Sequence, residues 1–245
     1  MPRATFRFYQ ELNDFLPVAQ RQVAFEHSWR GTPSIKHLIE SLGVPHTEID
    51  LILVNDRSVE WTYQPQDGDR VAVYPVFESF DITPLIRLRP QPLREVRFVL
   101  DGHLGRLAAY LRMLGFDTWY QNHVDDAVLA ETSKEERRIL LTRDQGLLKR
   151  SAVTHGYWVR ATASRVQLRE VVQRFDLQRL ARPFTRCLAC NGLLQAAALS
   201  EVKNEVPENT ARVYHEFWRC TACAKVYWPG SHYQRMTRLI EETLV

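Results

Sequence analysis

The four cysteines of the chain form two pairs whose spacing suits a metal ion. Cys187 and Cys190 make the first Cys-x-x-Cys pair, and Cys220 and Cys223 make the second. Two thiolates three residues apart across a tight turn can both point at one ion, so each pair supplies half of a tetrahedral zinc site. A site closed by four thiolates leaves no position for water, so we expect a structural zinc ion in a ribbon. A redox dithiol is the alternative, although a catalytic pair needs no duplicate.

The residues around the cysteines favour the same interpretation. Asn191-Gly192 follows the first pair, and both residue types tolerate the positive backbone dihedrals of a knuckle turn. His215 and His232 lie near the cysteines in the sequence. Because four thiolates already complete the site, we expect both histidines to be ordinary hydrogen-bonding residues.

Four aspartates form a second candidate site. Asp101 directly follows one apolar stretch and Asp144 lies two residues beyond another, while Asp125 and Asp126 open the helical pattern between them. Ligands of open parallel sheets bind beyond the carboxyl ends of the strands, so we expect these carboxylates to face one crevice. Carboxylates around a hard divalent cation suit metal-assisted hydrolysis of phosphodiesters.

Each of these residues also has an alternative role. Asp125 or Asp126 could be a helix N-cap, and Asp144 could cap a helix at Gly146, whereas Asp101 has no obvious helix to cap. Basic residues close to the acids in the sequence could contact phosphate, and exposed helix-face charge is the alternative for each. They are Arg106, Arg112, Arg143, Lys149 and Arg150.

The elements that would position the acids have the order typical of a parallel α/β domain, in which short apolar strands alternate with amphipathic helices. The expected strands cover residues 96–100, 118–121, 138–142 and 157–159. The expected helices cover residues 104–114, 126–134, 146–150 and 165–175.

The first part of the chain has a different order of elements. Strand patterns at residues 4–9, 51–54 and 70–74 surround a helix at 34–42, with Ser34 as its N-cap and Gly43 as its stop. A proline-rich stretch at residues 81–95 follows and predicts a linker. We therefore expect four parts: residues 1–80, the linker 81–95, an α/β domain at 96–180, and a zinc ribbon with a tail at 181–245. Residues 1–80 are expected to fold independently.

Composition and charge narrow the class of protein. Residues 1–80 have a charge balance of −4, so the remainder carries +7 and is compatible with an anionic partner such as nucleic acid. No apolar run is long enough for a membrane helix, and no secretory signal is evident. We therefore expect a cytoplasmic protein without a membrane partner, and in that reducing compartment paired cysteines favour metal binding over disulfides.

Residues 96–236 resemble a known family, the PIN-like ribonucleases named after the C-terminal domain of the Mut-seven exonuclease. The resemblance implies a PIN-like parallel sheet flanked by helices, with Asp101, Asp125, Asp126 and Asp144 binding catalytic Mg²⁺ or Mn²⁺. Such nucleases usually have a further acid after the last of these, where this chain has Ala161-Thr-Ala-Ser. The matching motifs are Phe98-Val-Leu-Asp101-Gly-His-Leu-Gly105-Arg-Leu-Ala-Ala-Tyr-Leu-Arg112-Met-Leu-Gly115-Phe-Asp117, then Asp125-Asp126, then Ile139-Leu-Leu-Thr-Arg143-Asp144, then Cys187-Leu-Ala-Cys190-Asn-Gly and Cys220-Thr-Ala-Cys223-Ala-Lys-Val-Tyr-Trp-Pro-Gly-Ser-His232.

The first eighty residues are similar to small ubiquitin-like sulfur carriers, in Asp67-Gly-Asp-Arg-Val-Ala-Val-Tyr74 and the helix before it. The resemblance implies a β-grasp (ubiquitin-like) domain. Sulfur carriers act through a free diglycine C-terminus, but here the chain continues through Phe77-Glu-Ser-Phe80. Carrier chemistry is therefore excluded, and we expect this domain to have a docking or regulatory role, with a protein partner possible.

The sequence thus predicts a metal-dependent ribonuclease in which RNA is the substrate. Arg106, Arg112, Arg143 and Lys149 would contact its phosphates. The alternatives are a non-catalytic RNA- or ribosome-binding adaptor with vestigial acids, favoured by the missing further acid, and a protein-interaction scaffold built on the ubiquitin-like domain.

Overall fold

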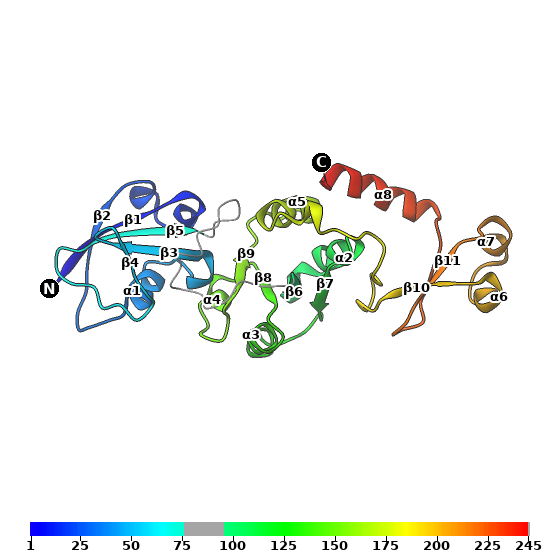
Figure 1. Ribbon diagram of the computed structural model, residues 1–245, viewed down its shortest axis with the longest axis horizontal. Helices are drawn as coiled ribbons and strands as arrows, with labels where there is room; N and C mark the ends of the chain where they lie inside the picture. Colours follow the sequence, from blue (N-terminus) through cyan, green and yellow to red (C-terminus); the bar gives the residue numbers. More distant parts are fainter. Residues whose placement is uncertain (76–95, 245) are drawn as a thin grey trace. The chain divides into compact units, whose positions relative to one another are not determined.

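The computed structural model describes residues 1–75 and 96–244, so the expected linker at 81–95 lies outside the described residues (Figure 1). The described part contains two larger sheets and one three-stranded sheet. None of its helices is both long enough and apolar enough to cross a membrane.

The N-terminal sheet is a mixed five-stranded sheet with the order β2-β1-β5-β3-β4. Strands β1 and β5 run parallel, and the other neighbouring pairs are antiparallel. This is the β-grasp arrangement expected from the sequence. The strands are β1 (Arg3–Phe8), β2 (Phe25–Ser28), β3 (Ile49–Val54), β4 (Arg57–Ser58) and β5 (Arg70–Pro75).

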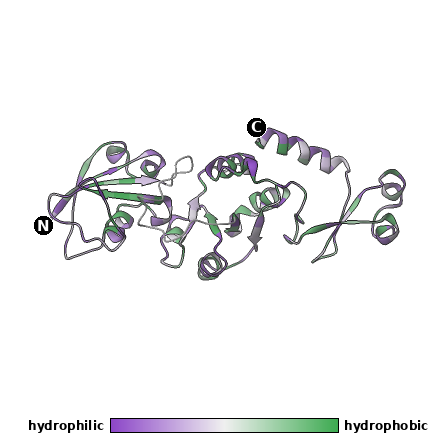
Figure 2. Ribbon diagram, viewed as in Figure 1, coloured by the Kyte–Doolittle hydropathy of each residue, from purple (hydrophilic) through white to green (hydrophobic). Residues whose placement is uncertain are grey.

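One helix, α1 (Ile35–Ser41), packs into the core of this sheet domain. It begins where the hydroxyl of Ser34 accepts a hydrogen bond from the backbone N–H of His37, as the sequence predicts. It ends before Gly43, whose φ of +108° is a conformation that only glycine adopts without strain. Strand β3 is apolar along most of its length in Figure 2, in keeping with its burial. Short 3-10 helices at η1 (Gln10–Phe15), η2 (Val18–Gln20) and η3 (His46–Glu48) complete the domain.

The second sheet has four strands in the order β7-β6-β8-β9. Strand β6 runs parallel to β7, and β8 runs parallel to β9. The expected alternation of strands and helices is confirmed, with boundaries that differ by one or two residues. The strands are β6 (Arg97–Leu100), β7 (Asp117–Tyr120), β8 (Ile139–Thr142) and β9 (Gly156–Trp158).

The helices of this domain bury the faces that the sequence pattern indicated. On α2 (Gly105–Met113), Leu107, Ala108 and Leu111 are fully buried, and the helix packs on β7 and α5. The remaining helices are η4 (Gly102–Leu104), α3 (Asp126–Glu135), α4 (Gln145–Leu148), α5 (Ser164–Arg174) and η5 (Leu177–Arg179).

The C-terminal part is an antiparallel sheet of order β10-β11-β12 followed by a helix. A small core of Val202, Val206 and Phe217 supports it. Its elements are β10 (Leu194–Ala197), α6 (Leu199–Val202), α7 (Glu208–Val213), β11 (Phe217–Cys220), β12 (Val226–Tyr227) and α8 (Ser231–Leu244).

The chain divides into two compact units that do not follow the expected domain boundaries. One unit combines residues 1–95 with 130–158, and the other combines 96–129 with 159–245. Each unit therefore joins one terminal module to two strands of the second sheet. The boundaries at residues 80, 95 and 180 stay a prediction.

Candidate functional site

The four cysteine sulfurs form one cluster at the ribbon. All four Sγ atoms lie within 4.8 Å of one another, and no disulfide joins them. The short distances connect the two knuckles, at 3.4 Å between Cys190 and Cys220 and 3.7 Å between Cys187 and Cys223. Four sulfurs in a tetrahedron around zinc, each ~2.3 Å from the ion, are roughly 3.8 Å apart. The cluster therefore has the donor set and dimensions of a four-thiolate metal site.

Hydrogen bonds make one of these thiols unusually acidic. Burial alone raises the pKa of Cys187, but the Tyr227 hydroxyl at 3.1 Å and the backbone N–H groups of Cys190 and Ala189 lower the pKa to about 6. Burial and the neighbouring thiols raise the pKa of Cys190 to about 12. Groups that favour a thiolate at one corner of the cluster favour metal binding, because only the thiolate is a ligand.

The knuckle turn needs its glycine for space. Asn191 has the expected positive φ of 71°, but Gly192 is not among the glycines with positive φ, so that part of the expectation is wrong. A Cβ on Gly192 would lie 2.9 Å from the Sγ of Cys220 and 2.8 Å from the Cβ of Ala222. Glycine is therefore required by the close approach of the second knuckle.

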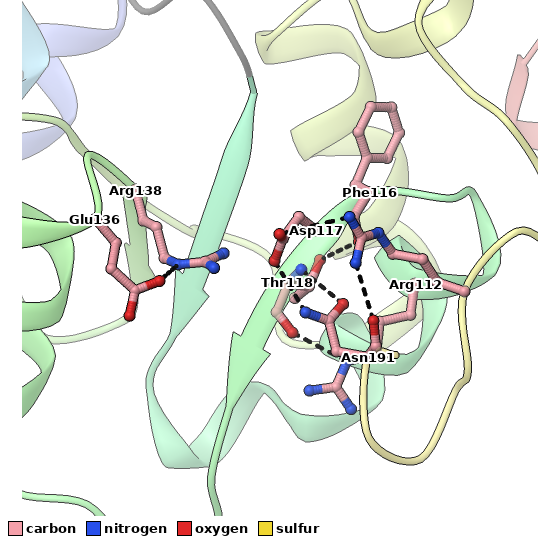
Figure 3. Close-up of polar contacts among 8 residues, drawn as sticks. Arg112, Phe116, Asp117, Thr118, Glu136, Arg138 and Asn191 are labelled. Carbon is pink, nitrogen blue, oxygen red and sulfur yellow. Dashed lines mark hydrogen bonds and ion pairs between the residues drawn. The ribbon is translucent and has the colours of Figure 1, made fainter. Parts of the chain in front are cut away.

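The first knuckle is fixed to α2 through Arg112, as Figure 3 shows in part. The Arg112 side chain is 5% exposed, and its guanidinium donates to the carbonyl oxygens of Thr118, Leu188 and Ala189 at 3.0, 3.2 and 2.9 Å. Burial lowers the pKa of Arg112, while Cys187 and Cys190 oppose that shift. From the sequence we expect a phosphate contact by Arg112, and this stays a prediction. In the structure two of these bonds hold the first knuckle and the third goes to β7.

Asn191 and Asp117 make the second connection between ribbon and sheet (Figure 3). The Asn191 amide donates to Asp117 Oδ1 at 2.9 Å, and its oxygen accepts from the backbone N–H of Thr118 at 3.0 Å. Arg186 contributes an ion pair to Asp117 at 3.5 Å. The sequence indicated the turn at Asn191 but gave no sign of this bridge, because its partners lie more than seventy residues apart.

Asp101 lies at the carboxyl end of β6, where two glycines allow a close approach. A Cβ on Gly102 would lie 2.7 Å from the carbonyl oxygen of Asn122, and one on Gly105 would lie 2.5 Å from the Tyr120 hydroxyl. The Tyr120 hydroxyl is 2.8 Å from the Gly102 carbonyl oxygen. The Asp-Gly-x-x-Gly spacing of the motif therefore packs the end of β7 tightly beside Asp101. The Asp101 carboxylate does not cap the short helix that follows it.

Asp125 and Asp126 are exposed at the start of α3. The Asp125 carbonyl accepts from the N–H groups of Val128 and Leu129, which makes Asp125 the residue before the helix. Asp101, Asp125 and Asp126 belong to the same unit. Among the described residues, only the four cysteines form a group of three or more such side chains close enough to share one ion. These three carboxylates are therefore not drawn together as the cysteines are.

Asp144 follows β8 and acts as an N-cap. Its Oδ1 accepts from the backbone N–H of Gly146 at 2.7 Å at the start of α4, which was the alternative role considered from the sequence. The neighbouring Arg143 is exposed, and its carbonyl accepts from the indole N–H of Trp158 at 3.2 Å.

The other basic candidates have different surroundings. Arg106 is exposed on the first turn of α2, and Arg150 is exposed after α4. Lys149 is half-buried, and its ammonium donates to the carbonyl oxygen of Glu40 at 3.1 Å. Lys149 therefore connects α4 to the N-terminal domain.

Two further residues attach the N-terminal domain to β9 and the loop before it. The buried Glu48 carboxylate accepts from the backbone N–H of Trp158 at 2.6 Å. The His46 ring lies 2.7 Å from a Glu40 carboxylate oxygen and 2.8 Å from the Val153 carbonyl oxygen. Buried polar groups of the N-terminal domain therefore have partners in residues 130–158, and the expectation that residues 1–80 fold independently stays a prediction.

The fold and the cysteine cluster define an α/β domain that follows a β-grasp sheet and carries a metal-binding ribbon. Residues 96–240 match the family model described as the Mut7-C RNAse domain, and residues 1–81 match the model described as Mut7-C ubiquitin. The chain belongs to the Mut7-C RNAse domain family. No curated protein and no solved structure matches it at a significant level.

Proposed function

We propose that the chain is a metal-dependent ribonuclease that hydrolyses phosphodiester bonds of RNA. The observation that carries this proposal is the match of residues 96–240 to the Mut7-C RNAse domain, which contains all four predicted acids. Asp101 and Asp144 each follow a strand of the second sheet, where ligands of parallel sheets bind. Carboxylate oxygens are the donors that Mg²⁺ and Mn²⁺ prefer.

In this proposal the acids hold the cations and exposed arginines hold the substrate. Asp101, Asp125, Asp126 and Asp144 are the proposed ligands of Mg²⁺ or Mn²⁺, which supply an activated water and neutralise charge on the leaving oxygen. Arg106 and Arg143 are exposed and carry the proposed phosphate contacts. We propose that Arg112 and Lys149, which donate hydrogen bonds to backbone carbonyls, stabilise the fold.

Further proposals concern the remaining parts of the chain. The cysteine cluster is proposed to hold one zinc ion that stabilises the ribbon, because four thiolates leave no open position. The ubiquitin-like domain is proposed to bind a protein partner. No disulfide joins the paired cysteines, which is typical of a reducing compartment, so we propose the cytoplasm as the location.

A non-catalytic RNA-binding adaptor is the second candidate. Two observations favour it: Asp144 is engaged as an N-cap, and Asp101, Asp125 and Asp126 do not form a close group in the described structure. In an adaptor the basic residues and the ribbon bind RNA, and the acids do no chemistry.

Replacement of Asp101 by asparagine separates the two candidates. The substitution keeps the side-chain shape but removes one negative charge, so a ribonuclease loses cleavage while RNA binding stays the same or strengthens slightly. Cleavage of a 5′-labelled single-stranded RNA in Mg²⁺ or Mn²⁺, with and without EDTA, measures the loss.

The matched control is Asp176→Asn, which removes the same charge at an exposed residue with φ of 45°, a conformation that asparagine tolerates. Cleavage that persists unchanged in Asp101→Asn points to a contaminating nuclease and refutes the assignment. Wild-type protein that binds RNA but never cleaves it supports the adaptor.

A further inference from the structure

An aromatic cavity lies between the ribbon and the start of α8. Its volume is about 350 Å³, at the small end of the roughly 300–1,000 Å³ found for ligand pockets. Five of its eleven lining residues are aromatic. They are Phe184, Trp218, Tyr227, Trp228 and Tyr233.

Three of the five aromatic residues have contacts that restrict their positions. The Tyr227 hydroxyl is hydrogen-bonded to the Sγ of Cys187 at 3.1 Å. The backbone N–H of Phe184 donates to the carbonyl oxygen of Met113 at 3.0 Å. The Phe184 and Tyr233 rings lie 4.4 Å apart between centroids, tilted by 31°. A rigid aromatic surface binds a flat partner with little loss of side-chain entropy.

The charges around the cavity are complementary to an anionic ligand. Arg186 is one of its lining residues but is ion-paired with Asp117 at 3.5 Å, and no Asp or Glu is among those that line it in the described part of the chain. The Lys225 ammonium lies 5.9 Å from the centroid of the Tyr227 ring. Arg235 lies on α8 between the lining residues Tyr233 and Met236. A ligand that combines a flat ring with a nearby phosphate fits both features.

We propose that this cavity binds an unstacked nucleobase of single-stranded RNA, with Lys225 and Arg235 beside the flanking phosphates. The inference rests on the proposed function, since it assigns the substrate class of that ribonuclease as single-stranded. Bases stack on aromatic rings without strong sequence preference, and a paired base within a duplex offers no free face for stacking. The cavity also lies within the residues matched by the RNase family model.

The test measures binding of a short fluorescein-labelled oligouridylate to the zinc-loaded full chain, in buffer without added Mg²⁺ or Mn²⁺. Tyr233→Leu keeps an apolar side chain but removes the ring, so the Kd rises about 10-fold. Tyr233→Phe keeps the ring and leaves the Kd within about 2-fold. Thermal unfolding and zinc content confirm that each variant is folded.

Two further measurements hold even where Tyr233→Leu fails to fold. An abasic oligomer of the same length binds the wild-type chain about 10-fold more weakly than oligouridylate. Lys225→Ala, an exposed change, reduces the slope of log Kd against log salt by about one.

Equal affinity for the abasic oligomer and for oligouridylate overturns the proposal. An unchanged Kd for oligouridylate in folded Tyr233→Leu also overturns it, and is the result expected if the cavity binds an apolar peptide instead. Failure of the proposed function is a separate outcome. A chain that binds oligouridylate through Tyr233 but never cleaves RNA retains this inference and refutes the ribonuclease.

Discussion

The two terminal modules are attached to the second sheet by opposite kinds of polar group. At the ribbon, the buried cation of Arg112 satisfies the carbonyl oxygens of the first cysteine knuckle. At the N-terminal domain, the buried anion of Glu48 satisfies a backbone N–H of the edge strand β9, beside ring contact between Phe15 and Trp158 at 4.9 Å. At each attachment, one charged side chain thus forms hydrogen bonds with backbone groups that have no partner in a β-sheet.

The difference predicts that the two attachments depend on different conditions. Two of the three carbonyls that Arg112 contacts, those of Leu188 and Ala189, lie inside Cys-x-x-Cys, so their positions would depend on a metal held by the cysteines. The partners of Glu48 and His46 belong to β9 and the loop before it, away from the cysteines. Loss of metal is therefore expected to loosen one attachment and leave the other intact.

Removal of zinc gives the largest effect. We expect about one zinc per chain by elemental analysis, and Cys187→Ser or chelation to remove it, because structural zinc contributes directly to folding free energy. Loss of at least 3 kcal/mol lowers the Tm by roughly 6–12 °C for a chain of this size. Native protein with four free thiols and no zinc would contradict this prediction.

Hydrogen exchange locates the same effect. We expect the amides of β7 and the first knuckle to lose protection after chelation, while those of β9 keep it. Equal loss of protection in both regions would show that the two attachments are not independent.

Arg112→Leu tests the attachment of the ribbon and leaves the four cysteines unchanged. Three carbonyl oxygens lose a charged donor, so we expect unfolding free energy to fall by on the order of 3 kcal/mol. Arg106→Ala, an exposed change on the same helix, is the control and should stay within about 0.5 kcal/mol. Urea unfolding measures both, and equal stabilities would show that Arg112 does not hold the ribbon.

Glu48→Met is the corresponding change at the N-terminal attachment. It leaves the N–H of Trp158 without its acceptor, which is expected to cost about 2 kcal/mol. Glu26→Met, at an exposed residue paired with Arg3, should change stability by less than about 0.5 kcal/mol. Hydrogen exchange at the Trp158 amide gives a local readout, and unchanged protection in Glu48→Met would refute the assigned contact.

Lys149→Ala and Arg143→Ala give the smallest effects and differ in kind. Lys149 donates one hydrogen bond to Glu40, so its loss should lower stability by less than about 1 kcal/mol and leave RNA affinity unchanged. Arg143→Ala should weaken RNA binding across sequences and lower the salt slope by about one, with stability unchanged. Weaker RNA binding with unchanged stability in Lys149→Ala would show that Lys149 contacts phosphate.

Local patterns in the sequence predicted most of the fold. The burial of Leu107, Ala108 and Leu111 follows from helical spacing, and the cysteine cluster follows from the span of each Cys-x-x-Cys. The carbonyl contacts of Arg112 and Lys149 did not follow from the sequence, because an arginine or lysine near acids has the same local pattern whether it contacts phosphate or a distant carbonyl. Their partners are 76 and 109 residues away, and one sequence gives no measure of such contacts.

The discontinuity of the N-terminal unit has a consequence during synthesis. The last β-grasp strand ends at Pro75, but Trp158, which covers Glu48 and Phe15, is translated much later. At about 5–20 residues per second, the roughly 80 residues between them take on the order of 4–16 s. For that interval the nascent chain lacks the backbone N–H that pairs with the Glu48 carboxylate and the ring that packs against Phe15, so the N-terminal unit completes these contacts only after residue 158 has been made.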